Sequence, residues 1–210
     1  MNSTTQRIRV LTVDDHPMIR DGIAAAVGAQ PDMQIVGEAG NGREALEQYR
    51  ALRPDVTLLD LNMPDVNGVD AINAIRTEFP DARIVVLTTY TGDVLALRAL
   101  KAGALGYLLK SSLRKELLGA IRDVHRGRRH IPAEVALAIA EHVGAEDLSE
   151  REIDVIRRVA TGLSNKEIGA HLSISEQTVK TYMKSILSKL DANDRSHAIT
   201  IALERGFIDL

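Results

Sequence analysis

The first 127 residues alternate short apolar runs with segments in which apolar residues recur every three or four positions. The five apolar runs are 8–13, 33–39, 55–60, 82–88 and 106–110. The segments with helical periodicity are 18–27, 41–53, 68–79, 93–103 and 113–127. Near-continuous apolar runs are typical of strands buried on both faces. The pattern therefore predicts five repeats of strand and helix, a doubly wound, flavodoxin-like α/β fold with a parallel five-stranded sheet.

The pattern changes after Gly127, and from Leu148 onward only helical signals remain. Residues 128–147 combine a basic cluster, a proline and a short helical pattern, so we expect a linker with some helix. Ser149 with Glu152, and Ser164 with Glu167, have the spacing of a capping box. Gly162 and Gly206 stand where helices are expected to end. The four expected helices are 149–161, 164–171, 175–190 and 194–205. The chain is thus divided into domains at 7–127 and 148–210, and the second is an all-α four-helix domain.

Three glycines between a strand and a helix suggest a different function. Gly37, Gly40 and Gly42 lie where the second strand passes into a helix that Asn41 and Glu44 are spaced to cap. A nucleotide-binding Rossmann domain would need G-x-G-x-x-G after the first strand, and this order is different. We therefore interpret these glycines as turn formers. The sequence also lacks a G-x-x-x-x-G-K-[ST] motif, which argues against direct use of ATP.

Composition narrows the class of protein further. The 210 residues carry a formal net charge of −3 and include no cysteine, which excludes disulfides and suits a reducing compartment. No apolar run is long enough to span a bilayer, and the N-terminal residues lack the apolar core of a signal peptide. These features predict a cytoplasmic protein without a membrane partner.

Polar residues end four of the predicted strands. Asp14 and Asp15 follow the first strand, Asp60 ends the third, Thr88 the fourth and Lys110 the fifth. Carboxyl ends of parallel strands lie at one edge of the sheet, where ligands bind in such folds. Taken singly, each of these residues is more simply a helix cap or a solvated side chain. Together they predict one site, in which clustered carboxylates require a cation, and the all-oxygen ligands suit Mg²⁺.

The same site suggests a phosphoryl-accepting carboxylate, since an aspartate can act as the nucleophile. The motifs "VDDHP", "LLDLNMPDVNG", "VVLTTY" and "GAxGYLLK" resemble the receiver domain of bacterial two-component response regulators over about residues 7–127. The resemblance implies Asp60 as phosphoacceptor, Asp14 and Asp15 as an acidic metal pocket, and Asn62 as a metal ligand through its backbone carbonyl. It also implies Thr88 and Tyr107 as a switch pair and Lys110 as the phosphate-binding lysine. Ser111 stands where many receivers have proline, so the loop after the lysine is expected to differ in shape.

Residues 164–190 have the pattern of a helix-turn-helix. On a helical wheel, Val179, Met183, Ile186 and Leu190 share one face, and Lys180 and Lys184 lie on the other. The second helix of such a pair lies in the major groove of DNA. Residues 148–210 contain nine Lys and Arg and nine Asp and Glu, and this balance also fits a solvated polar face.

Residues 148–199 are similar to the LuxR-type helix-turn-helix domain along their whole length. A receiver followed by this domain is the architecture of NarL/FixJ-type response regulators. The resemblance implies contacts to base edges from Lys180, Thr181 and Lys184. It also implies phosphate contacts from the residues Asn165, Lys166 and Thr178. Tyr182 departs from the family pattern, which commonly has histidine there.

These observations lead to the hypothesis of a phosphorylation-dependent transcription factor that is not an enzyme. A sensor histidine kinase would donate the phosphoryl group, and Mg²⁺ would be the cofactor. Phosphorylated dimers would bind a two-fold site on double-stranded DNA, with RNA polymerase as a further candidate partner. Ala198, Ile201 and Ala202 of the last helix are candidates for a dimer contact, and core packing is their other interpretation.

Two functions of other classes remain as alternatives. A signalling adaptor would use the helical domain to bind protein, which the balanced charge of residues 148–210 supports. A phosphatase would use Asp60 as a turnover nucleophile, but the D-x-D arrangement common in such enzymes is absent, since Asp14 is followed directly by Asp15.

Overall fold

The structure is a computed structural model of the chain, and it describes residues 7–63, 68–89, 92–142 and 146–208. Pro64 and Asp65, which lie within one of the receiver-like motifs, are outside the described residues. The chain divides into two compact units. The first consists of Met1–Thr89 and Ala96–Ala133, and the second of Tyr90–Leu95 and Glu134–Leu210.

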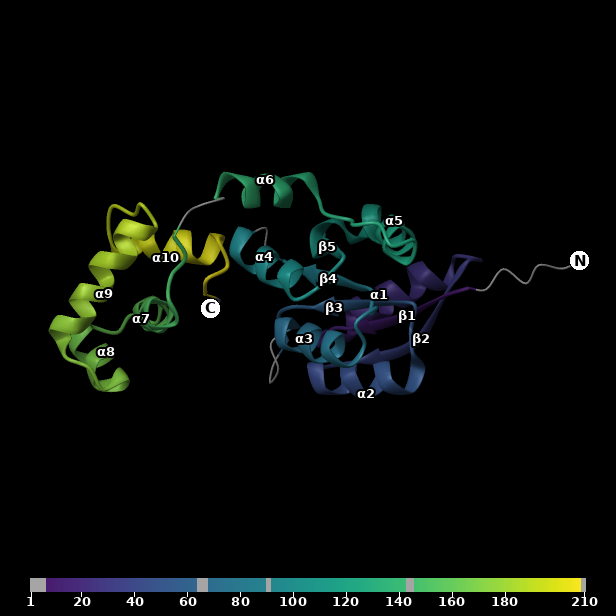
Figure 1. Cartoon of the computed structure of the whole chain (residues 1–210), viewed down its shortest axis with the longest axis horizontal. Coiled ribbons are helices and arrows are strands. Elements are labelled where there is room, and N and C mark those ends of the chain that lie inside the picture. Colours follow the sequence, from purple (N-terminus) through teal and green to yellow (C-terminus); the bar gives the residue numbers. More distant parts are fainter. Residues whose placement is uncertain (1–6, 64–67, 90–91, 143–145, 209–210) are drawn as a thin grey trace, which may run out of the picture. The chain divides into compact units, whose positions relative to one another are not determined.

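A five-stranded parallel sheet forms the centre of the first unit (Figure 1). Its strands are β1 (Ile8–Val13), β2 (Met33–Ala39), β3 (Val56–Asp60), β4 (Ile84–Thr88) and β5 (Gly106–Leu109). They are arranged in the order β2-β1-β3-β4-β5, and every neighbouring pair is parallel. Strands β3, β4 and β5 are buried along their whole length, as their apolar sequences predict. The predicted doubly wound α/β fold is therefore confirmed.

Helices cover both faces of this sheet. They are α1 (Pro17–Gly28), α2 (Gly42–Leu52), α3 (Gly68–Glu78), α4 (Asp93–Lys101) and α5 (Leu113–His125). Side chains of α1 and α5 share one apolar core with alternate residues of the strands. Helices α2 and α3 contact one another and lie on the opposite face (Figure 1). This layering leaves the carboxyl ends of the strands as the edge at which polar side chains meet.

Gly37 is not the turn former that the sequence suggested. It lies within β2, where the register with β1 shifts after Val10. A Cβ atom at Gly37 would clash with the end of the Leu52 side chain, so glycine here allows that side chain of α2 to lie directly against β2. The cap of α2 also differs from a full capping box. The Asn41 side chain accepts from the backbone of Glu44, but the Glu44 carboxylate accepts from Gly40.

Five helices follow the sheet: α6 (Ala133–Glu141), α7 (Glu150–Ala160), α8 (Asn165–Leu172), α9 (Glu176–Lys189) and α10 (Arg195–Glu204). The capping boxes of α7 and α8 are both formed as predicted. Gly162 and Gly206 have positive φ angles, as predicted for residues that end helices. None of the helices in the described ranges is long and apolar enough to cross a membrane.

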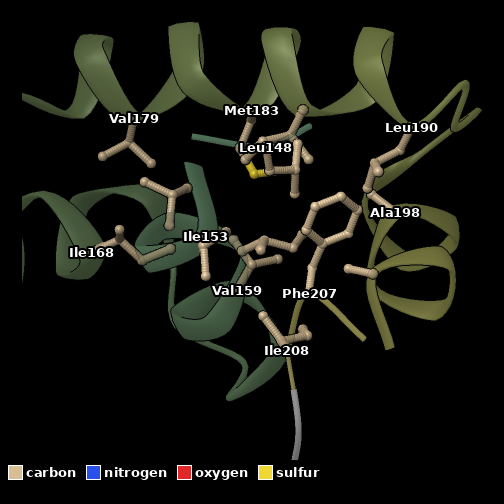
Figure 2. Close-up of a cluster of buried hydrophobic side chains, with 14 of the residues drawn as sticks. Leu148, Ile153, Val159, Ile168, Val179, Met183, Leu190, Ala198, Phe207 and Ile208 are labelled. Atoms are coloured by element: carbon tan, nitrogen blue, oxygen red, sulfur yellow. The ribbon is translucent and has the colours of Figure 1, made fainter. Parts of the chain in front are cut away.

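The core of the second unit lies between α7, α8, α9 and α10. Figure 2 shows Val179 and Met183 of α9 pointing toward Ile153 and Val159 of α7. The predicted apolar face of α9 is therefore its buried face. Ala198 and Ala202 of α10 are fully buried in the same core. Core packing, the other interpretation of these two alanines, is therefore confirmed, and Ile201 is partly buried against the same core.

Gly169 allows α8 to approach the turn that leads into α9. A Cβ atom at this position would lie 2.7 Å from the backbone oxygen of Ile174. We expect the Gly169→Ala variant to lower the free energy of unfolding of this unit by about 1–3 kcal/mol, because backbone must move to relieve the clash. Urea unfolding followed by the methyl NMR signals of Ile156 and Ile186 measures this loss. Gly119→Ala on α5 is the matched control, since nothing lies within 4 Å of its added Cβ. Equal stability of the Gly169→Ala variant and the parent would contradict the prediction.

Candidate functional site

The predicted acidic residues meet at the carboxyl edge of the sheet. Asp14 and Asp60 are both fully buried, Asp14 directly after β1 and Asp60 at the end of the adjacent strand β3. Lys110, directly after β5, places its Nζ atom 2.8 Å from Asp14 Oδ2 and 2.8 Å from Asp60 Oδ2. Carboxylate oxygens of Asp14, Asp15 and Asp60 lie within 4.8 Å of one another. Three carboxylates and one ammonium group thus form one cluster with a surplus of negative charge, which suits a divalent cation.

Burial and charge act against each other at Asp60. Burial raises the pKa of the Asp60 carboxyl, the nearby Asp14 carboxylate adds to the rise, and bonds from Lys110 and the Asn62 backbone oppose it. The Asn62 N–H donates to Asp60 Oδ1 at 3.1 Å. Burial alone would lower the pKa of Lys110, but its contacts with Asp14 and Asp60 raise it above the usual range. The two carboxylates therefore favour the charged form of Lys110, which holds an ammonium group between Asp14 and Asp60.

His16 is a neighbour of the cluster to which the sequence analysis gave no role. Its Nδ1 atom lies 2.7 Å from Asp15 Oδ1 and 3.3 Å from Asp14 Oδ1. Its backbone N–H also donates to Asp14 Oδ1 at 2.9 Å. The only sequence signal was its place directly after the two aspartates. Arg20 of α1 completes the surroundings by donating to the Asp14 carbonyl at 2.6 Å.

The expected switch pair, Thr88 and Tyr107, lies on the adjacent strands β4 and β5. Both side chains are fully buried. Burial raises the pKa of the Tyr107 hydroxyl, and its hydrogen bond with the Thr88 side chain opposes that rise. This inward arrangement is the one that we expect to follow phosphorylation. The Tyr107 N–H also donates to the carbonyl of His130 at 2.8 Å, so the backbone after α5 is bonded to β5 at this residue.

Ser111, which stands where many receivers have proline, lies in a short turn directly after β5. Residues Lys110–Ser112 form a short 3₁₀ turn, in which the Ser112 hydroxyl donates to the carbonyl of Leu109. The described residues contain no cis peptide bond. Ser111 therefore leaves the lysine in place without a cis-proline turn.

The residues expected to read base edges lie on α9, away from its buried face. Lys180, Thr181 and Lys184 are all exposed. Lys180 Nζ lies 2.8 Å from Glu176 Oε1, a pair one turn apart. Lys184 has no ion-pair partner within the described parts of the chain. Tyr182, which stands where the family commonly has histidine, is partly buried and packs against the apolar core.

The residues expected to meet phosphates lie at the beginnings of two helices. Asn165 and Lys166 open α8, and Thr178 lies in the first turn of α9. The Thr178 hydroxyl is 2.7 Å from that of Ser175, which caps α9. Helix N-termini carry a partial positive charge, so this placement favours a bound anion.

Glu152 of α7 binds the C-terminal half of α9, a role that the sequence analysis did not assign to it. Its carboxylate accepts from Ser185 at 2.6 Å, from the Ser149 backbone at 2.7 Å and from Lys189 at 3.0 Å. Burial of this carboxylate opposes ionisation, but these bonds outweigh it and hold the pKa of Glu152 at about 2. The buried carboxylate thereby fixes the orientation of the helix that carries Lys180 and Lys184.

This low pKa predicts a loss of stability in acid. A carboxyl whose pKa is depressed on folding stabilises the folded state above its unfolded value of 4.5, and that contribution is lost as the pH falls towards 2. The shift corresponds to roughly 3 kcal/mol of the free energy of unfolding. Urea unfolding at a series of pH values, followed by the NMR signals of Ile153 and Ile186, should show this loss. The Glu152→Gln variant should lack it, while Glu150→Gln, an exposed residue of the same helix, should retain it. An unchanged pH dependence in Glu152→Gln would contradict the assignment.

Comparison with known proteins identifies both units. Residues 10–122 match the family described as response regulator receiver domain. Residues 146–202 match the family described as bacterial regulatory proteins, luxR family. The chain belongs to the two-component response regulators that combine a receiver domain with a LuxR-type DNA-binding domain. Members of this family are transcriptional regulators and not enzymes, so the phosphatase alternative is set aside.

Relatives match almost the whole length of the chain. The transcriptional regulatory protein LiaR of Bacillus subtilis is 42% identical, over 93% of this chain and 96% of that protein. The response regulator protein VraR of Staphylococcus aureus is 37% identical, over 96% of this chain and 99% of that protein. A solved structure of RcsB from Salmonella enterica serovar Typhimurium, bound to promoter DNA in the presence of the phosphomimetic BeF₃⁻, matches with a TM-score of 0.71. It is 25% identical, over 96% of this chain and 100% of that chain.

Proposed function

We propose that a sensor histidine kinase phosphorylates Asp60 and that the phosphoryl group controls binding of residues 148–210 to DNA. The observation that supports this most strongly is the Asp60 carboxylate, buried at the end of β3, with the Lys110 ammonium 2.8 Å away. A structural carboxylate would not need Asp14 and Asp15 beside it, since like charges in one place repel. The cluster is therefore better explained by a reactive role of the Asp60 carboxylate than by a structural one.

The chemistry is the transfer of a phosphoryl group from a phosphohistidine of the kinase to the unmodified carboxylate of Asp60. An Asp60 carboxylate oxygen attacks the phosphorus atom of the phosphohistidine, the P–N bond breaks, and the electron pair returns to the imidazole. The product is an acyl phosphate on Asp60. Lys110 lies within reach of an oxygen of the transferred group and offsets its negative charge. The Thr88 hydroxyl, at the end of β4, would donate a hydrogen bond to a second oxygen of the phosphoryl group.

The donor set of the pocket fits Mg²⁺. Asp14, Asp15 and Asp60 provide carboxylate oxygens within 4.8 Å of one another, and the Asn62 carbonyl is the fourth proposed ligand. Hard oxygen ligands of this kind are those that Mg²⁺ prefers. When bound, Mg²⁺ supplies neutralisation of negative charge on the phosphoryl oxygens.

Hydrogen bonds connect Thr88 of β4 through Tyr107 of β5 to His130, which lies in the proposed linker. Thr88 would move toward the phosphoryl group, and the buried Tyr107 is hydrogen-bonded to Thr88. The backbone of Tyr107 is in turn bonded to His130, at the start of the linker. A change at Thr88 would therefore reach the segment that leads to the DNA-binding helices.

Each part of the chain has its own role and partner. Residues 7–127 are the receiver, 128–147 the linker and 148–210 the DNA-binding domain. Phosphorylated dimers place α9 of each copy in the major groove of a two-fold site, in the cytoplasm, with RNA polymerase as a further partner. Contacts to DNA come from the residues Asn165, Lys166, Thr178, Lys180, Thr181 and Lys184. The DNA-bound RcsB structure supports this arrangement by analogy.

Selection of bound DNA from a random pool tests this function. With acetyl phosphate and Mg²⁺ present, the full chain should enrich sites with two-fold symmetry, and enrichment should be weaker without the phosphoryl donor. The absence of any enriched sequence in both conditions would contradict DNA binding and favour the adaptor alternative.

A further inference from the structure

Arg195 connects two helices that are far apart in the sequence. It is the first residue of α10, yet its guanidinium group lies at the beginning of α8. One guanidinium nitrogen donates to Asn165 Oδ1 at 3.0 Å, and the other donates to the carbonyl of Leu163. No carboxylate pairs with Arg195 within the described ranges. Both of these hydrogen bonds from its charged guanidinium group go to neutral oxygen atoms.

This contact determines which end of the Asn165 side chain is available. A guanidinium group has donors and no acceptor, so the atom of Asn165 that faces it must be the amide oxygen. The amide NH₂ group, with two hydrogens to donate, is then left for another partner. Phosphate oxygens are acceptors only, so an asparagine held in this orientation presents the correct group to a DNA backbone.

We propose that Arg195 is a positioning residue for DNA binding, which orients the Asn165 amide so that its NH₂ group donates to a DNA phosphate. This inference rests on the proposed DNA-binding function. Arg195 acts through Asn165 and through the Leu163 carbonyl, which fixes the segment that precedes the Ser164 cap. Arg195 is partly buried, and in this proposal it makes no contact of its own with DNA.

The salt dependence of binding separates this role from a direct contact. A cation that pairs with a phosphate releases a counterion, so its removal lowers the slope of log affinity against log salt by about 0.9. Asn165 is neutral, so the loss of its contact weakens binding without changing that slope. Arg195→Ala should therefore weaken binding at every salt concentration by the same factor, whereas Lys166→Ala should reduce the slope by about one.

The experiment is a fluorescence anisotropy titration of the phosphorylated full chain on its selected DNA site. We expect Arg195→Ala and Asn165→Ala each to lower affinity about 5- to 10-fold, and the double variant to lower it no further, because one interaction is lost in all three. Arg157→Ala, an exposed arginine of α7, is the matched control and should bind like the parent. Losses that multiply in the double variant, or a slope reduced by about one in Arg195→Ala, would overturn the proposal.

A second variant keeps the test valid if Arg195→Ala fails to fold. Asn165→Asp preserves the bond to Arg195 but replaces the NH₂ donor with an oxygen, so we expect a loss at least as large as that of Asn165→Ala. Parent-like affinity of Asn165→Asp would overturn the proposal. Lys184→Ala distinguishes this outcome from a failure of the proposed function. If Lys184→Ala weakens binding while the Asn165 variants do not, the roles of Asn165 and Arg195 are wrong, and DNA binding through α9 stands.

Discussion

Replacing Asp60 with asparagine is expected to abolish incorporation of a phosphoryl group from acetyl phosphate. The amide is a poor nucleophile and cannot form the acyl phosphate, so the labelled fraction should fall about 100-fold or more. The fold should be retained, because asparagine has nearly the same shape and removes a carboxylate whose ionisation is opposed by burial and by Asp14. Intact mass measured after incubation with acetyl phosphate and Mg²⁺ gives the labelled fraction directly.

The control for this experiment is Asp81→Asn. Asp81 is an exposed aspartate between α3 and β4 and lies outside the acidic cluster. Its substitution should leave the labelled fraction unchanged. An Asp60→Asn protein that gains the same mass as the parent would show that another residue accepts the phosphoryl group, and the assignment of Asp60 would be abandoned.

Substitution of either exposed lysine on α9 is expected to weaken binding to the selected DNA site. Side chains that pair with base edges contribute about 1–3 kcal/mol each, so Lys180→Ala and Lys184→Ala should each lower affinity about 5- to 150-fold. The Lys184 variant should show the cleaner loss, because Lys180 is already paired with Glu176 in the absence of DNA contacts. Anisotropy titrations on the specific site and on a scrambled site measure the effect.

The ratio of the two affinities is the informative quantity. Loss of a base contact should reduce binding to the specific site more than binding to the scrambled site, whereas loss of a phosphate contact reduces both alike. Arg157→Ala again serves as the control for removal of one exposed positive charge. Parent-like affinity and parent-like specificity in both lysine variants would contradict the placement of α9 in the major groove.

Much of the fold was predictable because local and tertiary signals agree. The apolar runs of β3, β4 and β5 are buried on both faces, and Ser149 and Ser164 cap the helices that their spacing indicated. Asp14, Asp60 and Lys110 were found together because parallel strands bring their carboxyl ends to one edge. That inference needs only the order of the strands and the residues at their ends.

The features that the sequence did not predict depend on which side chains meet across long separations. Glu152 was recognised as a capping residue, but its bonds to Ser185 and Lys189 require the packing of α7 on α9. Arg195 contacts Asn165 only because α10 returns to the beginning of α8. Gly37 resembles a turn former because Gly40 and Gly42 follow it closely, whereas in the structure it lies within β2 against the Leu52 side chain.

The most direct test of the whole account is a DNA titration of one protein preparation before and after phosphorylation, with the phosphorylated fraction of Asp60 measured by mass in each sample. The account predicts that affinity for the selected site rises with the phosphorylated fraction and returns to its starting value once the acyl phosphate has hydrolysed. Identical binding curves for fully phosphorylated and unphosphorylated protein would contradict it.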